Sequence, residues 1–129
     1  MFTVRKVFRF EAAHILTTAF SKCCQRVHGH SYVVEVFLAN AILNPDGMVE
    51  DFGKVKEVVG PILEAWDHKL IKQDDDDDYC GPDEVVLVDF NPTAENMARN
   101  IYRRAKKSLP CLFKIRVHET TTGWAEYEE

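Results

Sequence analysis

Residues 28–39 read HGHSYVVEVFLA, and their pattern predicts a strand with one buried face. Alternate side chains of a strand point to the same side, so a period of two is typical of a strand that covers a hydrophobic core. The apolar face of this segment carries His28, His30, Tyr32, Val34, Val36 and Leu38. Both histidines therefore lie on the buried side, where the strand begins.

The preceding segment, residues 2–14, reads FTVRKVFRFEAAH and alternates in the same way. Its apolar face, with Lys6 as an exception, carries Phe2, Val4, Phe8, Phe10 and Ala12. His14 continues that face at the far end of the strand. If the two strands pair antiparallel, the end of the first lies beside the start of the second, and we expect His14, His28 and His30 to converge at one edge of the core.

Three neutral imidazoles can hold a zinc ion and leave a fourth position open, which is the arrangement of a catalytic zinc site. We favour this interpretation over three unrelated core or surface histidines. An alternative is a closed structural site that adds Cys23 or Cys24 to the histidines, although adjacent cysteines do not match the usual C-x₂₋₄-C spacing. A thiol beside the metal, and not bound to it, would have a lowered pKa and could act as a base.

The chain has 129 residues and a formal net charge of −5. This length predicts one domain, residues 1–129, with a hydrophobic core of its own. The charge argues against a nucleic-acid partner, which requires clustered Lys and Arg. No apolar run reaches the roughly 18 residues of a membrane span and no signal peptide is present, so we expect a cytoplasmic protein with reduced thiols.

Two helices are predicted in the middle of the chain. Residues 50–70 carry apolar side chains at helical spacing, and Gly60 with Pro61 should kink or split this helix. Thr93 is a suitable N-cap for a second helix, with Met97, Ile101 and Ala105 as its inner stripe. Between them, VVLVDF at residues 85–90 predicts a short buried strand, and the aspartate run at residues 74–78 predicts solvated chain.

The last segment, residues 112–127, reads LFKIRVHETTTGWAEY and predicts a strand with Phe113, Ile115 and Val117 inward, followed by a short strand at residues 124–127. Glu119 continues the inward parity. A buried carboxylate is costly unless something requires it; it could bind a planar amidine such as a pterin edge through paired hydrogen bonds, or pair with an arginine. The order β-β-α-(β)-α-β-β predicts an α+β protein, with an antiparallel sheet and helices on one face.

Asp67 and His68 follow the first helix pattern. A carboxylate can orient an imidazole and make it a proton relay. Adjacent residues on a helix point about 100° apart, so the sequence leaves open whether the two side chains pair or His68 is an ordinary surface histidine.

The motifs FEAAH, C-x-x-x-HGH, DFGKVK, DH, NPTAEN and HET occur here in the order found in the 6-pyruvoyl-tetrahydropterin synthase / 6-carboxy-tetrahydropterin synthase family, which the chain resembles from Phe10 to about Thr121. The resemblance implies a tunnelling fold (T-fold), with a four-stranded antiparallel sheet, two helices on one face and the order β-β-α-α-β-β. It also implies a homo-oligomer, a hexamer, in which the sheets join into a barrel and active sites form between subunits.

The resemblance further implies one zinc ion per subunit and a role for each matching residue. The metal ligands are His14, His28 and His30; Cys24 abstracts a proton; Asp67 and His68 form a relay contributed by a neighbouring subunit; Glu119 belongs to the relay or contacts the pterin; and Glu95 anchors the pterin. The implied substrate is 7,8-dihydroneopterin triphosphate.

The family has branches that differ in product. The carboxy-forming branch releases acetaldehyde and triphosphate on the way to queuosine, and the pyruvoyl branch eliminates triphosphate on the way to tetrahydrobiopterin. The C-x₃-HGH spacing of Cys24 resembles the carboxy branch, and a branch that replaces this cysteine with glutamate does not match. Three features depart from the family pattern: the extra thiol Cys23, a DHKLI without the usual Asn, and a longer acidic segment at residues 72–89. A non-catalytic protein with a structural Cys/His zinc site remains the alternative of another class.

Overall fold

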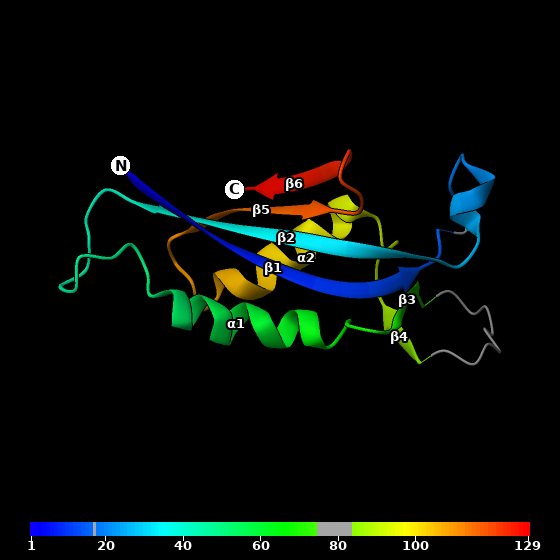
Figure 1. Cartoon of the computed structure of the whole chain (residues 1–129), viewed down its shortest axis with the longest axis horizontal. Helices are drawn as coiled ribbons and strands as arrows, with labels where there is room; N and C mark the ends of the chain where they lie inside the picture. The colour runs from blue at the N-terminus through cyan, green and yellow to red at the C-terminus, as the bar shows by residue number, and fades with distance from the viewer. Residues whose placement is uncertain (17, 75–83) are drawn as a thin grey trace.

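The computed structural model describes residues 1–16, 18–74 and 84–129. Its elements are β1 Phe2–His14, the 3-10 helix η1 Lys22–Gln25, β2 His28–Asn40, α1 Phe52–Glu64, β3 Leu70–Gln73, β4 Val85–Val88, α2 Ala94–Lys106, β5 Leu112–His118 and β6 Trp124–Glu128. The strands in this part of the chain form one six-stranded sheet in the order β4-β3-β1-β2-β5-β6 (Figure 1).

The central hairpin of β1 and β2 confirms the predicted antiparallel pair. Its register runs without a break from Phe2 opposite Asn40 to His14 opposite His28. The even-numbered residues of both strands, among them Phe10, Tyr32 and Val34, join the buried side chains of both helices in one hydrophobic core. The helices therefore cover one face of the sheet, and the histidines stand at the end of that covered face.

The two helices begin where the sequence predicts. The carboxylate of Asp51 accepts from the Gly53 amide at the start of α1 (2.6 Å), and the Thr93 hydroxyl accepts from the Asn96 amide at the start of α2 (3.2 Å). The predicted inner stripe of α2 is confirmed, because Met97, Ile101 and Ala105 are fully buried. No described helix is long and apolar enough to cross a membrane.

Helix α1 is not split at Gly60 and Pro61, contrary to one of the two outcomes that the sequence suggested. It runs as one element to Glu64 with Pro61 inside. A proline in a helix removes one backbone hydrogen bond, but Val59, Ile62 and Leu63 around it are buried in the core. Burial of this apolar side holds the last turn in place despite the missing bond.

The expectation of a four-stranded, wholly antiparallel sheet is corrected by β3 and β4. Strand β3 pairs parallel with the end of β1, at Leu70 with Ala13 and Ile71 with His14, and β4 pairs parallel with β3. The sheet is therefore mixed. Strand β4 coincides with the predicted VVLVDF segment. Strand β3 begins shortly after α1 ends, so the sequence pattern of the helix did not reveal it as a separate strand. Of the aspartate run, only Asp74 lies in the described residues, and its amide donates to the Val88 carbonyl (2.9 Å).

A bulge in β5 corrects one predicted core position. The register with β2 shifts between Phe37 and Leu38, so that Leu38 pairs with Leu112 and Phe37 with Lys114. Leu112 is consequently fully buried in line with Ile115 and Val117, and Phe113 is only half-buried. The predicted short strand at the end of the chain is present as β6, which lies at one edge of the sheet.

Candidate metal centre

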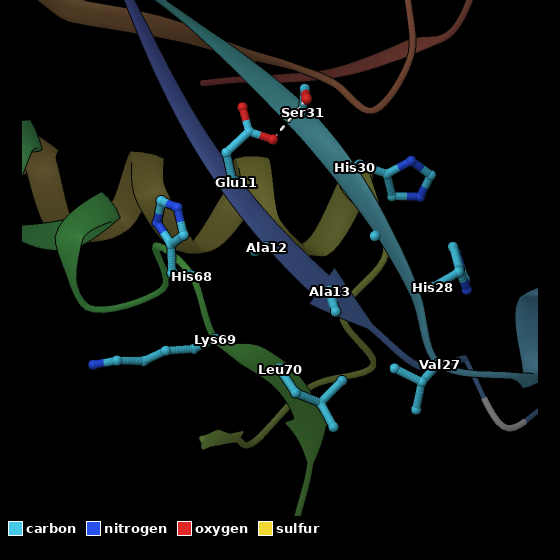
Figure 2. Close-up of a pocket in the computed structure, with 11 residues that line it drawn as sticks. Glu11, Ala12, Ala13, Val27, His28, His30, Ser31, His68, Lys69 and Leu70 are labelled. Atoms are coloured by element: carbon cyan, nitrogen blue, oxygen red, sulfur yellow. Dashed lines mark hydrogen bonds between the residues drawn. The ribbon is translucent and has the colours of Figure 1, made fainter. Parts of the chain in front are cut away.

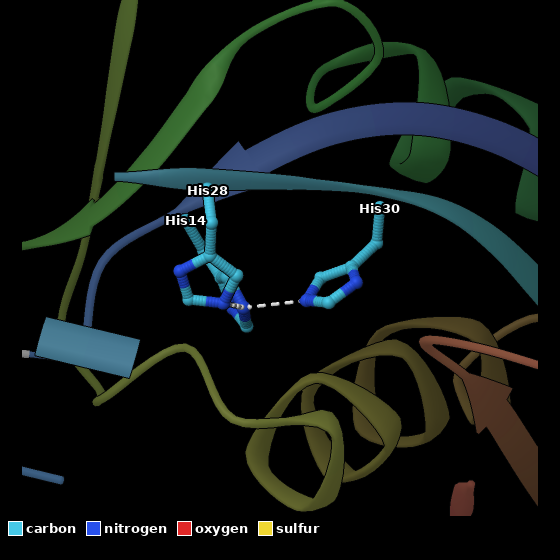
Figure 3. A group of neighbouring side chains, drawn as sticks. All are labelled: His14, His28 and His30. Carbon is cyan, nitrogen blue, oxygen red and sulfur yellow. Dashed lines mark hydrogen bonds between the residues drawn. The ribbon is translucent and has the colours of Figure 1, made fainter. Parts of the chain in front are cut away.

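Three histidines meet at the end of the β1–β2 pair. The register places His14 opposite His28 and Ala12 opposite His30, so the three imidazoles lie on one face. The Nε2 atom of His14 lies 2.8 Å from Nε2 of His28 and 3.1 Å from Nε2 of His30. Figure 3 shows the three rings turned toward one point. The predicted convergence is confirmed, and the group could hold a metal ion.

Two backbone carbonyls fix which nitrogen of each ring carries the proton. His14 Nδ1 lies 2.7 Å from the Pro92 carbonyl and His28 Nδ1 lies 2.7 Å from the Arg26 carbonyl. A carbonyl can only accept, so both Nδ1 atoms carry hydrogen and both Nε2 atoms present lone pairs. Lone pairs that face each other at this distance repel unless a cation lies between them. Such carbonyl support of ligand histidines is the usual surrounding of a metal site.

The spacing of the nitrogens fits a tetrahedral ion. Zn–N bonds of about 2.0–2.1 Å at tetrahedral angles separate two ligand nitrogens by roughly 3.4 Å. The observed separations of 2.8 and 3.1 Å are a few tenths of an ångström shorter. Small rotations of the imidazoles would therefore be enough to accept the ion.

The charge state of the cluster also suits a metal. Burial lowers the pKa of His14 to about 4, helped by His28 and His30, and outweighs the opposing bond to Pro92. Burial and the neighbouring His28 also lower the pKa of His30. The rings of His14 and His30 are thus neutral at pH 7, which is the form that binds a metal ion.

Neither thiol belongs to the cluster. Cys24 is half-buried in η1 and Cys23 beside it is exposed, and both are free. The Cys24 carbonyl accepts from the Leu16 amide (2.9 Å), which ties the turn to the end of β1. Burial raises the pKa of the Cys24 thiol, followed by its contact with Cys23 and by the charge of Glu119. The closed Cys/His site therefore has no support in this geometry, and Cys24 lies within electrostatic reach of Glu119.

Glu119 stands beside the histidines, directly after β5. Its Oε2 atom lies 3.8 Å from Nε2 of His30, so its partner in the described chain is a histidine and not the arginine considered from the sequence. Burial raises the pKa of Glu119, and the nearby Glu95 raises it further, while the Ala94 amide acts in the opposite direction. Both carboxylates line a cavity of about 210 Å³ that Thr120, Gly123, Trp124 and Ala125 help to enclose.

Asp67 and His68 do pair. His68 Nδ1 lies 3.0 Å from Oδ2 of Asp67. The pairing is possible because α1 ends at Glu64 and His68 adopts a left-handed backbone with φ of 59°. The other oxygen, Asp67 Oδ1, accepts from the Glu11 amide (2.9 Å). This amide and His68 lower the pKa of Asp67, which stays ionised and orients the imidazole.

The Asp67–His68 pair lies beside β1, apart from the cluster of three histidines. Figure 2 shows the His68 ring on one side of the β1–β2 pair, with His28 and His30 on the other. A cavity of about 550 Å³ borders His68 and is also lined by His28, His30, Glu11 and Ser31. His68 and two of the three histidines therefore border the same open cavity.

Sequence reasoning missed three groups at this site. The carbonyls of Pro92 and Arg26 give no sequence signal, because every residue has a carbonyl. Tyr32 was recognised only as a core residue, yet its hydroxyl is the one buried side-chain polar atom without a partner in the described residues. The pattern HGHSY could have drawn attention to it, since Tyr32 is the next residue on the face of the two histidines.

Comparison with known proteins agrees with this arrangement. A family model described as 6-pyruvoyl tetrahydropterin synthase matches residues 3–129. The chain is 33% identical over 143 residues to the 6-carboxy-5,6,7,8-tetrahydropterin synthase of Haemophilus influenzae, with 100% of both chains covered. It is 32% identical over 157 residues to the protein of that name from Aquifex aeolicus, which covers 98% of this chain and 97% of that one.

Solved structures share the fold. The 6-pyruvoyl tetrahydropterin synthase of Caenorhabditis elegans is similar with a TM-score of 0.77 and 27% identity, covering 99% of this chain and 95% of that one. An uncharacterized protein of Wolinella succinogenes is similar with a TM-score of 0.86, at 20% identity and with 99% and 98% covered. The second likeness concerns the fold alone.

Proposed function

The chain belongs to the 6-pyruvoyl tetrahydropterin synthase family and has its tunnelling fold, and from this premise we propose that it is a zinc-dependent 6-carboxy-5,6,7,8-tetrahydropterin synthase. Its substrate is 7,8-dihydroneopterin triphosphate, and it releases acetaldehyde and triphosphate in a lyase reaction on the way to 7-deazapurines such as queuosine. One observation carries the catalytic part of the proposal: three imidazole nitrogens converge, while the thiol of Cys24, within electrostatic reach of Glu119, is not part of their cluster.

His14, His28 and His30 hold one zinc ion per subunit. When bound, the ion would act as a Lewis acid that polarises the side-chain oxygens of the substrate and acidifies the neighbouring C–H and O–H bonds. The carbonyls of Pro92 and Arg26 keep the Nε2 atoms of His14 and His28 free of protons. Cys24 lies off the cluster, and although its surroundings raise the pKa of the thiol in the metal-free chain, a bound zinc ion nearby would lower this pKa and favour the thiolate that takes a proton from the substrate.

Glu119 and Glu95 hold the pterin ring. The 2-amino-4-oxo edge of a pterin carries two parallel N–H donors, which a carboxylate can accept together. Both glutamates line the small cavity beside the metal ligands, with the Trp124 side chain at its wall. Glu119 also lies next to His30. This places the recognised edge of the ring in the glutamate cavity and the reacting side chain toward the histidines.

The Asp67–His68 relay serves the site of a neighbouring subunit. Asp67 binds Nδ1 of His68 and leaves the other ring nitrogen free to carry a proton. The resemblance to the family supports a relay that acts on the metal site of a second copy. We therefore propose a homo-oligomer with active sites between subunits, the hexamer of the family.

The runner-up activity is that of a 6-pyruvoyl-tetrahydropterin synthase. The similarity to the C. elegans enzyme of that name favours it. The spacing of Cys24 to His28 and the names of the bacterial relatives favour the carboxy-forming reaction. The two reactions differ in whether the pterin keeps its three-carbon side chain.

A product assay decides between them. Zinc-loaded protein is incubated with 7,8-dihydroneopterin triphosphate, acetaldehyde is measured by coupled reduction, and the pterin is identified by mass. The proposal expects acetaldehyde and a carboxylated pterin in equal amounts. A pterin that retains its side chain, with triphosphate released, would establish the pyruvoyl reaction, and an unchanged substrate would reject both.

A further inference from the structure

The hydroxyl of Tyr32 is buried without a hydrogen-bond partner. Tyr32 is fully buried, and no other buried side-chain nitrogen or oxygen in the described part of the chain lacks a partner. An unpaired buried hydroxyl costs stability, and a native protein that retains one has a reason to do so. Phenylalanine would fill the same space without this cost.

The register places Tyr32 beside Glu119. Strands β2 and β5 pair at Val34 with Val117 and at Val33 with His118, so the next pair in the same register is Tyr32 with Glu119. Residues directly opposite each other have Cβ atoms about 4.5–5.5 Å apart. A tyrosine hydroxyl has an ordinary pKa of about 10, so the phenol is protonated at neutral pH and can act as a donor.

The same ring borders the metal ligands. Tyr32 stacks on Phe10 at 4.7 Å, and its centroid lies 5.4 Å from that of His30 and 6.0 Å from that of His14. It thus borders two of the three histidines, one of which, His30, lies next to Glu119. Within the described residues, no group accepts a hydrogen bond from this hydroxyl.

Metal binding would change the partners of Glu119. Its Oε2 atom lies 3.8 Å from Nε2 of His30, the atom that also faces the point where the imidazoles meet. A nitrogen that binds an ion carries no hydrogen and cannot donate to a carboxylate. Glu119 then needs another donor, and the unpaired hydroxyl of Tyr32 is its cross-strand neighbour.

We propose that in the metal-loaded protein the Tyr32 hydroxyl donates a hydrogen bond to the Glu119 carboxylate, directly or through one water, and holds it in position for the N–H edge of a pterin. Tyr32 is then a positioning residue that acts through Glu119. The pterin part of this proposal rests on the proposed function, whereas the hydrogen bond between the two side chains does not.

The test compares Tyr32→Phe with Tyr102→Phe. Tyr102 is equally buried but donates to the Leu112 carbonyl (3.4 Å) and lies in α2, away from the metal ligands. Melting temperatures are measured for each protein without metal and with zinc. The increase in melting temperature caused by zinc should be smaller in Tyr32→Phe than in wild type, and unchanged in Tyr102→Phe. Equal increases in all three proteins would overturn the hydrogen bond.

The second measurement is the affinity of the zinc-loaded proteins for neopterin, followed by its fluorescence. Tyr32→Phe should weaken binding about tenfold or more, as expected for a hydrogen bond to a charged group, while Tyr102→Phe should bind as wild type does. In a Glu119→Gln background the Tyr32 substitution should add less than about twofold, since it acts through that carboxylate. Independent effects of the two substitutions would refute the positioning role.

The two measurements test the Tyr32–Glu119 hydrogen bond and the proposed function separately. Wild-type protein that fails to bind neopterin would contradict the proposed function, and the melting temperatures would still decide whether Tyr32 pairs with Glu119. Neopterin binding that does not change in Tyr32→Phe would leave the proposed function intact and reject the role of Tyr32.

Discussion

His14 and His28 face each other across the β1–β2 pair with their Nε2 atoms 2.8 Å apart. The Nδ1 atom of each ring donates a hydrogen bond to a backbone carbonyl. Hydrogens on the outer nitrogens leave unprotonated inner nitrogens in mutual contact. This pairing is unfavourable without a cation between them, and His30 completes a set of three donors. The candidate metal site is therefore a consequence of strand register together with two carbonyls.

The substitution His28→Ala should release the metal without breaking the fold. His28 lies at the rim of the core and only partly buried, so its removal costs one of three ligands and little packing. We expect zinc content to fall from one per subunit to near zero, with the elution volume in gel filtration unchanged. His118→Ala is the matched control, because His118 bonds to Glu35 and not to the cluster (2.9 Å). Full zinc occupancy in His28→Ala would refute the ligand assignment.

Acid should destabilise the metal-free protein through His14. Its pKa is lowered from 6.5 to about 4 in the folded state, so the unfolded chain binds the proton more tightly. The stabilising contribution of the neutral ring is present above pH 6.5 and is lost as the pH falls toward 4. The full loss is about 3 kcal/mol. Urea unfolding of chelator-treated protein between these pH values measures it, and His14→Gln should flatten the dependence.

The two adjacent cysteines should behave differently when each is replaced. Cys24→Ala should retain zinc and lose turnover by roughly 10²–10⁴-fold, the range for removal of a general base. Cys23→Ala should keep both zinc and turnover, since Cys23 is exposed. Zinc analysis and initial rates on the same preparations test this. Loss of zinc from Cys24→Ala would instead support the structural Cys/His site.

Mixing two inactive variants should restore activity. In the proposed arrangement, one subunit supplies the Cys24 thiol of a site and a neighbouring subunit supplies the His68 imidazole. A mixed site is therefore intact where the Cys24 comes from a His68→Ala subunit and the His68 comes from a Cys24→Ala subunit. Co-refolding the variants in equal amounts should recover about a quarter of wild-type activity, the statistical share of intact sites in a symmetric oligomer. Either variant refolded alone is the control. A mixture as inactive as its components would show that each chain uses its own His68.

The sequence predicted the convergence of the three histidines because a single pattern determines it. A period of two assigns the faces of β1 and β2, and an antiparallel hairpin forces His14 next to His28. No other part of the fold has to be known for this result. Glu119 could be placed at the same end because it continues the parity of Ile115 and Val117, which the register of β5 confirms.

The errors arose where tertiary contacts outweigh local pattern. Leu70 and Ile71 form β3 because they are buried against β1. A strand of only four residues is too short to show an alternating hydrophobic pattern of its own. The β5 bulge moves Phe113 away from the fully buried positions of the strand, and no residue in that segment predicts a bulge. The contact of Asp67 with His68 depends on a left-handed backbone at His68 and on the Glu11 amide, which is 56 residues away in sequence.

The beginning of α2 touches both halves of the site, since Pro92 accepts from His14 and the Ala94 amide supports Glu119. The segment 92–94 therefore connects His14, a candidate metal ligand, with Glu119, the proposed pterin contact. Thermodynamic reciprocity then requires that, if zinc tightens the hold on a pterin, the pterin tightens the hold on zinc by the same factor.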